Sequence, residues 1–190
     1  MSETDFDAIV VGAGIVGAVS AFTLSERGYR VALVEAHALG RGTSDNSFAW
    51  VNATSKTANE PYHRLNAAGA DGYRTYAQRW GERAIGLHPS GMVQWVRNDN
   101  VADAAQLQAR RETLAGFGYP VSPLSRADLV RMEPHVAFEA NVEGLYALAD
   151  AWLDAPTFIA FIAERLRENG GRIFDNCRAL ELMLDGNGAV

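Results

Sequence analysis

The sequence is poor in the residues on which several classes of protein depend. It has one cysteine, Cys177, and four histidines among 190 residues. A single cysteine cannot form an internal disulfide, and together with scattered histidines it offers no metal-ligand spacing, so we predict no metal site. Because so little cysteine suits a reducing compartment, we expect a cytoplasmic protein.

Long hydrophobic runs and an excess of positive charge are also missing. The apolar stretches are well short of the ~20 residues that a membrane-spanning helix requires. The acidic start, Met1–Asp5, lacks the basic region of an export signal. The net charge is −6, and Lys56 is the one lysine among 17 basic residues. We therefore expect no integral membrane segment and no nucleic-acid partner.

The residues that are present predict an α/β fold. With 48% hydrophobic residues the chain can form a core, which excludes a disordered chain. A β-branched run at 6–11 and a second at 30–34 are typical of buried strands. Between them, residues 15–24 have helical spacing that stops at Gly28. A strand, a helix and a strand in so few residues predict a βαβ unit with a parallel sheet.

The rest of the chain predicts a mixture of helices and strands after a long polar loop at 36–58. A helix from Glu60 to about Arg83 carries an aromatic stripe that we interpret as a core face: Tyr62, Leu65, Gly69, Tyr73, Tyr76 and Trp80. Cys177 is predicted to be buried at the start of a strand. Further strands are predicted at 91–97, 142–148, 172–174 and 177–184. Helices are predicted at 101–116, after the capping box Ser125–Asp128, and from Asp154 to Gly170. A hairpin turn is predicted at 185–188.

The most informative segment is the glycine motif that follows the first strand. Gly12 permits the tight turn, Gly14 has no Cβ and lets a pyrophosphate approach, and Gly17 lets the helix pack closely on the strand. Glu35 ends the second strand, 18 residues after Gly17. This context predicts a dinucleotide-binding fold. The alternative, that the glycines serve packing alone, does not explain Glu35.

The first turn of the motif helix offers amides without internal partners, including those of Ile15 and Val16. These amides and the helix dipole favour a diphosphate. Glu35, followed by Ala36, is expected to accept hydrogen bonds from ribose hydroxyls and to disfavour NADP. The motif alone does not distinguish NAD from FAD as the cofactor, because both contain the same ADP half.

The loop at 41–47 offers a guanidinium, hydroxyls and backbone amides just after the second strand. We expect Arg41, Thr43 and Ser44 to reach the pyrophosphate from the side away from the helix. The alternative is a solvated, turn-rich loop.

These motifs, in this order, resemble the FAD-dependent oxidoreductases of the D-amino acid oxidase and glycine oxidase type. The resemblance rests on residues 7–36, Gly40–Ser44, Met132–Pro134 and Ala151–Pro156. It implies a Rossmann-like FAD-binding domain with a parallel sheet, interrupted by the start of an α+β substrate domain. The implied division is 1–84 for the FAD-binding domain, 85–151 for the substrate domain, and 152–190 for the return to the FAD-binding domain.

The resemblance also implies a function and its residues. Gly12, Gly14, Gly17 and Glu35 match the ADP-binding positions, and the Thr43–Ser44 pair matches the loop that approaches the phosphates and the flavin. The implied reaction is hydride transfer from an amine or amino acid to FAD, which gives an imine that hydrolyses. We assign no catalytic residue.

In this family the substrate-binding arginine and a second flavin segment lie beyond the length seen here. We therefore expect an N-terminal part that needs a C-terminal half or a partner chain, and that is inactive alone. The alternatives are an NAD-dependent dehydrogenase and a non-catalytic fragment or subunit.

Overall fold

The computed structural model describes residues 6–183, which form two compact units. Within the described residues, unit 1 comprises 6–49, 84–86 and 154–183, and unit 2 comprises 50–83 and 87–153. In the part of the chain that the structure describes, no helix is both long enough and apolar enough to cross a membrane.

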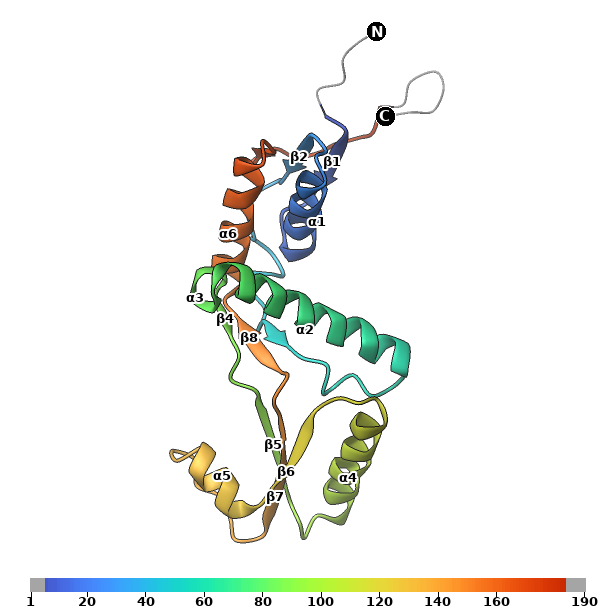
Figure 1. Cartoon of the computed structure of the whole chain (residues 1–190), viewed down its shortest axis with the longest axis vertical. Coiled ribbons are helices and arrows are strands. Elements are labelled where there is room, and N and C mark those ends of the chain that lie inside the picture. Colours follow the sequence, from blue (N-terminus) through green and yellow to red (C-terminus); the bar gives the residue numbers. More distant parts are fainter. Residues whose placement is uncertain (1–5, 184–190) are drawn as a thin grey trace. The chain divides into compact units, whose positions relative to one another are not determined.

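Unit 1 contains the predicted βαβ unit. Its three strands form an entirely parallel sheet in the order β1-β2-β9, with Ala8 paired to Val31 and Ala32 paired to Arg172. The parallel sheet and the Rossmann-like α/β class are thus confirmed. The elements of unit 1 are β1 (Ala8–Val11), α1 (Ile15–Glu26), β2 (Val31–Val34), α6 (Ala155–Glu168) and β9 (Arg172–Phe174) (Figure 1).

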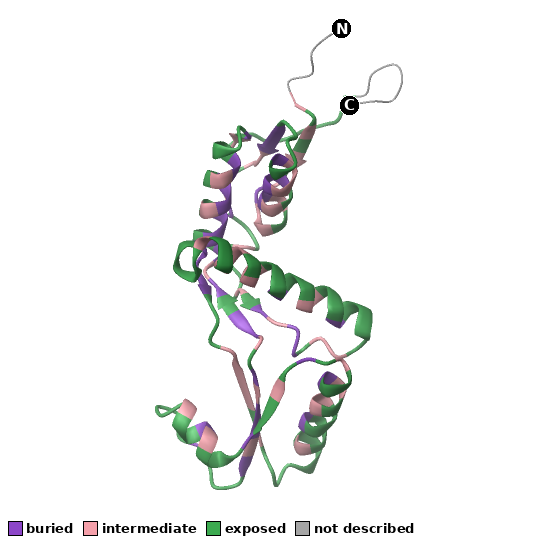
Figure 2. Ribbon diagram, in the orientation of Figure 1, coloured by how far each residue is buried: buried purple, intermediate pink, exposed green. Residues whose placement is uncertain are grey.

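The core of unit 1 lies between the sheet and the helices α1 and α6. Buried residues line the sides of the two helices that face each other (Figure 2). Helix α6 begins as predicted, because the Asp154 side chain accepts a hydrogen bond from the Thr157 amide and Pro156 lies in the first turn. The packed cluster contains Ala13, Ala21, Val31, Leu33 and Leu166.

The prediction of a fully buried first strand was wrong for one face of β1. Val10 packs into the core cluster, but Ile9 is 58% exposed and Val11 is 62% exposed. Successive side chains of a strand point to opposite faces, so the sheet carries its helices on the Val10 face. A short β-branched run cannot show by itself whether both faces are covered.

Unit 2 contains two small antiparallel sheets, with orders β3-β8-β4 and β5-β7-β6. Three longer helices belong to it, and the single turn α3 (Glu82–Ile85) contains the boundary between the units. The strands are β3 (Trp50–Val51), β4 (Leu87–His88), β5 (Met92–Arg97), β6 (Val121–Leu124), β7 (Val142–Ala147) and β8 (Ala151–Leu153), and the helices are α2 (Glu60–Trp80), α4 (Val101–Gly116) and α5 (Arg126–Met132).

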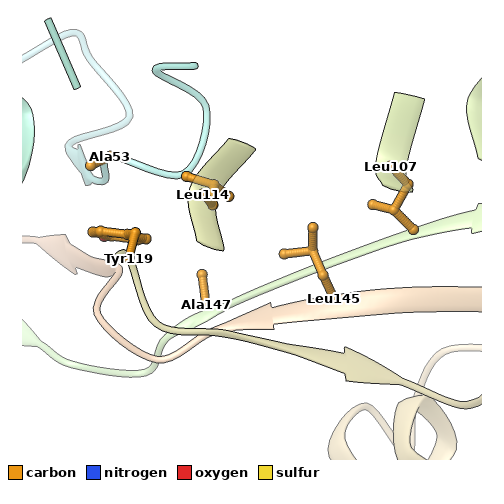
Figure 3. Packing of buried hydrophobic residues seen from close by; sticks show 6 residues of the cluster. All are labelled: Ala53, Leu107, Leu114, Tyr119, Leu145 and Ala147. Atoms are coloured by element: carbon orange, nitrogen blue, oxygen red, sulfur yellow. The ribbon is translucent and has the colours of Figure 1, made fainter. Parts of the chain in front are cut away.

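The central strand β7 is packed on both faces. On one face, Leu107 and Leu114 of α4 point toward Leu145 and Ala147 of β7 (Figure 3). On the other face, Leu129 of α5 packs with Val142. Helix α5 opens with the predicted capping box, in which both reciprocal hydrogen bonds between Ser125 and Asp128 are present.

The aromatic stripe of α2 forms the predicted core face only in part: Tyr73, Tyr76 and Trp80 are half-buried, whereas the members nearer the start of the helix are exposed. Tyr62 is 46% exposed and Leu65 is 70% exposed, whereas the buried residues of this helix are His63 and Ala70. The imidazole Nδ1 of His63 lies 3.1 Å from the carbonyl oxygen of Ala53, and the ring packs against Phe117 and Tyr119 on the inward side of α2.

Two predictions near the end of the described chain were also wrong. Cys177 is exposed, and residues 177–183 contain no strand. The amide of Cys177 donates to the carbonyl of Glu35, so the segment follows β2 without extending the ladder. The predicted hairpin turn at 185–188 lies outside the described residues. The short strands β3, β4, β6 and β8 were not predicted from the sequence.

The first boundary between the units lies at 49/50, whereas the resemblance implied 84. Residues 50–83 group with unit 2 because β3 pairs with β8 and α2 places His63 against Tyr119. The chain returns to unit 1 at Asp154, two residues after the implied position. The assignment of the units to cofactor and substrate stays a prediction.

A buried carboxylate connects three segments of unit 2. Asp150 is 1% exposed, and its Oδ1 accepts a hydrogen bond of 2.6 Å from the Tyr119 hydroxyl. Burial raises the pKa of Asp150, while the hydroxyls of Tyr119 and Thr54 and the amides of Ala53 and Thr54 act in the opposite direction.

We expect the Asp150→Asn substitution to flatten the dependence of stability on pH. Because the pKa of Asp150 is raised from 3.8, the folded state binds the proton more tightly than the unfolded chain does. The contribution of this group to the free energy of unfolding therefore decreases as the pH rises from about 4 through the raised pKa. Urea unfolding between pH 4 and 8 should show a smaller decrease for the variant. The exposed control Glu181→Gln should follow the parent profile, and parallel profiles for parent and Asp150→Asn would contradict the assignment.

Candidate functional site

The start of α1 differs from the starts of the other longer helices. In the described residues α2, α4, α5 and α6 each begin with a side-chain cap, supplied by Asn59, Asn100, Ser125 and Asp154 respectively. The N-cap residue of α1 is instead Gly14, which has no side chain to cap the helix. The first turn of α1 also has no acidic residue. No side chain of the helix itself or of its N-cap residue therefore competes with an anion for the first amides and the positive end of the dipole.

Each of the three motif glycines meets a different structural requirement. Gly12 has a φ of +98°, which other residues adopt only with strain. A Cβ on Gly17 would lie 1.8 Å from the carbonyl oxygen of Gly12, so α1 crosses the turn in close contact with its backbone. A Cβ on Gly14 would lie 3.2 Å from the Ser44 hydroxyl oxygen. The turn and the close helix packing expected from the motif are therefore both present.

The carboxylate of Glu35 faces the glycine motif. Its Oε2 accepts a hydrogen bond of 2.8 Å from the Ala13 amide, and its Oε1 accepts one of 2.9 Å from the His37 amide. These two amides, joined by that of Ala36, lower the pKa of Glu35 against a smaller opposing effect of burial. The acid is therefore ionised at neutral pH and lies beside the turn.

The loop after β2 also reaches the start of α1. The Ser44 hydroxyl oxygen accepts a hydrogen bond of 3.2 Å from the Ile15 amide, so Ser44 lies at the N-terminus of α1. The loop begins at Gly40, whose amide donates to the carbonyl oxygen of Ala13. The Ile15 amide already donates to a side-chain oxygen here, and a phosphate oxygen is an acceptor of the same kind.

The other residues predicted to bind the cofactor make no hydrogen bond to the glycine turn or to Glu35 that the structure shows. Val16 is 78% exposed on the first turn of α1, and Thr43 is exposed. Arg41 is exposed, and its guanidinium pairs with Asp45 at 3.2 Å. The structure thus brings together the motif glycines, Ile15, Glu35, Ala36 and Ser44.

Sequence reasoning missed two contributions to the site, both made by backbone groups. The Ala13 amide holds the Glu35 carboxylate, and the Ala13 carbonyl holds the start of the 41–47 loop through Gly40. The position of Ala13 inside the motif was a signal for the first contact. Nothing in its side chain indicates the second, because the loop contact depends on the path of the backbone.

This arrangement resembles a site for an adenine dinucleotide, and the comparison with known families agrees. Residues 7–190 match the family described as FAD dependent oxidoreductase, abbreviated DAO. The chain belongs to this family. The resemblance stated from the sequence motifs is thereby confirmed, and so is FAD as the cofactor that the family implies.

Curated relatives in this FAD-dependent family include amino-acid oxidases. The chain is 27% identical over 189 residues to a protein named glycine oxidase from Geobacillus kaustophilus, an alignment that covers 97% of this chain and 50% of that protein. It is also 27% identical over 184 residues to mouse peroxisomal sarcosine oxidase, covering 95% of this chain and 45% of that protein. The chain therefore spans about half the length of these relatives.

Solved structures show the same correspondence. The crystal structure of the Geobacillus kaustophilus glycine oxidase superposes with a TM-score of 0.83 at 26% identity, over 96% of this chain and 50% of that one. L-proline dehydrogenase from P. horikoshii has a TM-score of 0.82 at 17% identity, which shows a shared fold only. The FAD-dependent oxidase fold is thus confirmed for the length that this chain spans.

We expect the Gly17→Ala substitution to destabilise unit 1, because the added methyl group overlaps a backbone carbonyl that cannot move aside. The expected loss in the free energy of unfolding is about 3 kcal/mol, at the upper end of the usual cost of overpacking. The matched control is Gly69→Ala in α2, where an added Cβ meets nothing within 4 Å. This control should gain about 0.5–1 kcal/mol, because alanine favours helices. Urea unfolding measures both, and equal effects of the two substitutions would refute the close contact.

Proposed function

We propose that this chain is the cofactor-binding part of an FAD-dependent oxidoreductase that oxidises an amine or an amino acid. The observation that carries the proposal is the start of α1, where a glycine replaces the side-chain cap and Glu35 lies beside the turn. An NAD-dependent dehydrogenase shares such a turn, but family membership favours FAD.

Each residue of the cluster has a proposed role toward the ADP half of FAD. The amides of Ile15 and Val16 would bind the phosphates, with Gly14 leaving room for them. Ser44, which now accepts the Ile15 hydrogen bond, would rotate away from that amide or bind a phosphate oxygen itself. Glu35 would accept hydrogen bonds from the ribose hydroxyls, because it is negatively charged and lies at the end of β2.

The substrate is proposed to be a small amine or amino acid. The curated relatives are named for glycine and sarcosine, which supports a small amine-bearing substrate. When bound, the flavin would supply the hydride acceptor for this chemistry. No side chain of this chain is proposed to transfer a proton: His37, His88 and His135 are exposed, and His63 is buried against Phe117 and Tyr119.

We further propose that turnover needs residues that this chain does not contain. The chain spans about half the length of its relatives, so a C-terminal half or a partner chain would complete the substrate site. A cytoplasmic location is proposed on the low cysteine content.

We expect weak FAD binding by this chain alone, because the second flavin segment of the family lies beyond it. At equal concentration FAD should still raise the melting temperature more than NAD does, because a ligand stabilises the state that binds it. Replacing Glu35 by Gln should weaken FAD binding by roughly tenfold or more, the equivalent of losing a hydrogen bond to a charged group. Thermal shift and equilibrium dialysis measure both effects. The control Glu181→Gln, at an exposed position of the same unit, should bind FAD like the parent. Equal shifts with the two dinucleotides, or unchanged binding by Glu35→Gln, would refute the proposed site.

A further inference from the structure

A cavity lies between helix α2 and the turn that follows α4. Its volume is about 450 Å³, and all of its lining residues belong to unit 2. The polar residues that line it are on α2, namely His63, Arg64, Asp71 and Arg74, and residues 117–120 of the turn complete the opposite wall. Cavities of this size bind small organic molecules in many proteins.

His63 is the buried polar residue of this wall. It is 2% exposed, and its Nδ1 lies 3.1 Å from the carbonyl oxygen of Ala53. Because a carbonyl oxygen can only accept, Nδ1 carries the proton of this hydrogen bond and donates it. The Nε2 atom of the neutral ring is then an acceptor, and no hydrogen bond to it is present in the described part of the chain.

The free Nε2 atom of His63 remains accessible from the cavity. Among residues 6–183, the fully enclosed side-chain polar atoms that lack a hydrogen bond belong to Thr54, Asp150 and Arg165, and His63 is not one of these residues. The Nε2 atom therefore keeps some accessible surface, and His63 lines the cavity. A hydrogen-bond donor bound there would supply the partner that the protein does not provide.

Two guanidinium groups give the same cavity a positive side. Arg64 donates to Glu60 through Nε and Nη2. Arg74 donates to the Ala149 carbonyl through Nη1 and to Asp71 through Nη2. In the described residues, Nη1 of Arg64 and Nε of Arg74 make no hydrogen bond. Since two of the three charged residues that line the cavity are positive and keep unused donors, an anionic group is favoured there.

The rest of the wall is apolar and holds the imidazole in place. Ala67, Ala68 and Pro120 line the cavity together with Phe117 and Tyr119. The ring centroids of Phe117 and Tyr119 lie 4.8 Å and 5.0 Å from that of His63. The acceptor is thus fixed before any ligand arrives, which reduces the entropy cost of binding.

We propose that this cavity binds a small organic acid that carries a hydroxyl group and an apolar or aromatic body. The hydroxyl would donate to Nε2 of His63, and the body would lie against Phe117. The carboxylate would pair with the guanidinium groups of Arg64 and Arg74. A hydroxybenzoate has these three parts. The residues proposed to bind FAD do not line this cavity, so the assignment goes beyond the proposed function and does not depend on it.

The test titrates this chain, without FAD, with 4-hydroxybenzoate and two analogues by isothermal titration calorimetry. Benzoate lacks the hydroxyl donor and should bind about tenfold more weakly, because Nε2 of His63 then stays unpaired. Phenol lacks the carboxylate and should bind about three- to fivefold more weakly, because ion pairs at an exposed mouth contribute little. In NMR spectra of the imidazole nitrogens, the Nε2 resonance of His63 should shift with 4-hydroxybenzoate and the Nδ1 resonance should not.

Two substitutions test the two polar ends of the site. Arg64→Gln, at a side chain that is 68% exposed, should weaken binding of 4-hydroxybenzoate about three- to fivefold. Its matched control is Arg131→Gln on α5, also exposed and also paired with an acid on its own helix, which should bind like the parent. His63→Asn keeps a donor for the Ala53 carbonyl and removes Nε2. It should weaken 4-hydroxybenzoate about tenfold and leave the affinity for benzoate unchanged.

The proposal is overturned if 4-hydroxybenzoate does not bind, if benzoate binds equally well, or if Arg64→Gln binds like the parent. An unchanged Nε2 resonance of His63 at saturating ligand would also overturn it. Should His63→Asn not fold, the three ligands and the Arg64→Gln variant still decide the result. Because these titrations contain no FAD, failure of the FAD experiment would reject the proposed function and leave this site to be judged separately.

Discussion

The contact between Gly17 and the carbonyl oxygen of Gly12 is the constraint on which unit 1 depends. Since a Cβ on Gly17 would lie 1.8 Å from that oxygen, α1 can leave the turn in this direction only with glycine at position 17. The direction of α1 then determines where its first amides point. The same turn places the Ala13 amide against the Glu35 carboxylate. One close backbone contact thus orients both the proposed phosphate site and the acid beside it.

The site uses backbone groups more than side chains. Four other helices in the described chain satisfy their first amides with a capping side chain, whereas α1 begins with glycine and receives the Ser44 oxygen from a distant loop. Because the donors belong to the backbone, an anion can be bound here without lysine or arginine. This agrees with a chain that has a single lysine and a net charge of −6.

The two units are built on different principles. The chain leaves unit 1 at 49/50, returns to it briefly at 84–86 and returns again at Asp154, so all of unit 2 lies between β2 and β9 in the sequence. Unit 2 consists of antiparallel sheets, with a buried pair, Asp150 and Tyr119, at its polar centre. The parallel pairing of Ala32 with Arg172 joins residues 140 positions apart, whereas the pairing of Ala8 with Val31 joins residues 23 positions apart.

Local patterns in the sequence determined the βαβ unit, the capped helices α4, α5 and α6, and the position of the glycine motif before Glu35. Each of these depends on neighbouring residues: a glycine at a turn, an oxygen-bearing cap, or a regular apolar spacing. Tertiary structure decided which faces are buried. Ile9 and Leu65 fit buried patterns and are exposed, and Cys177 is exposed as well, because burial depends on what packs against a residue from elsewhere in the chain. The approach of Ser44 to the start of α1 was decided in the same way, since the hydrogen bond joins residues 29 positions apart whose meeting depends on the path of the intervening backbone.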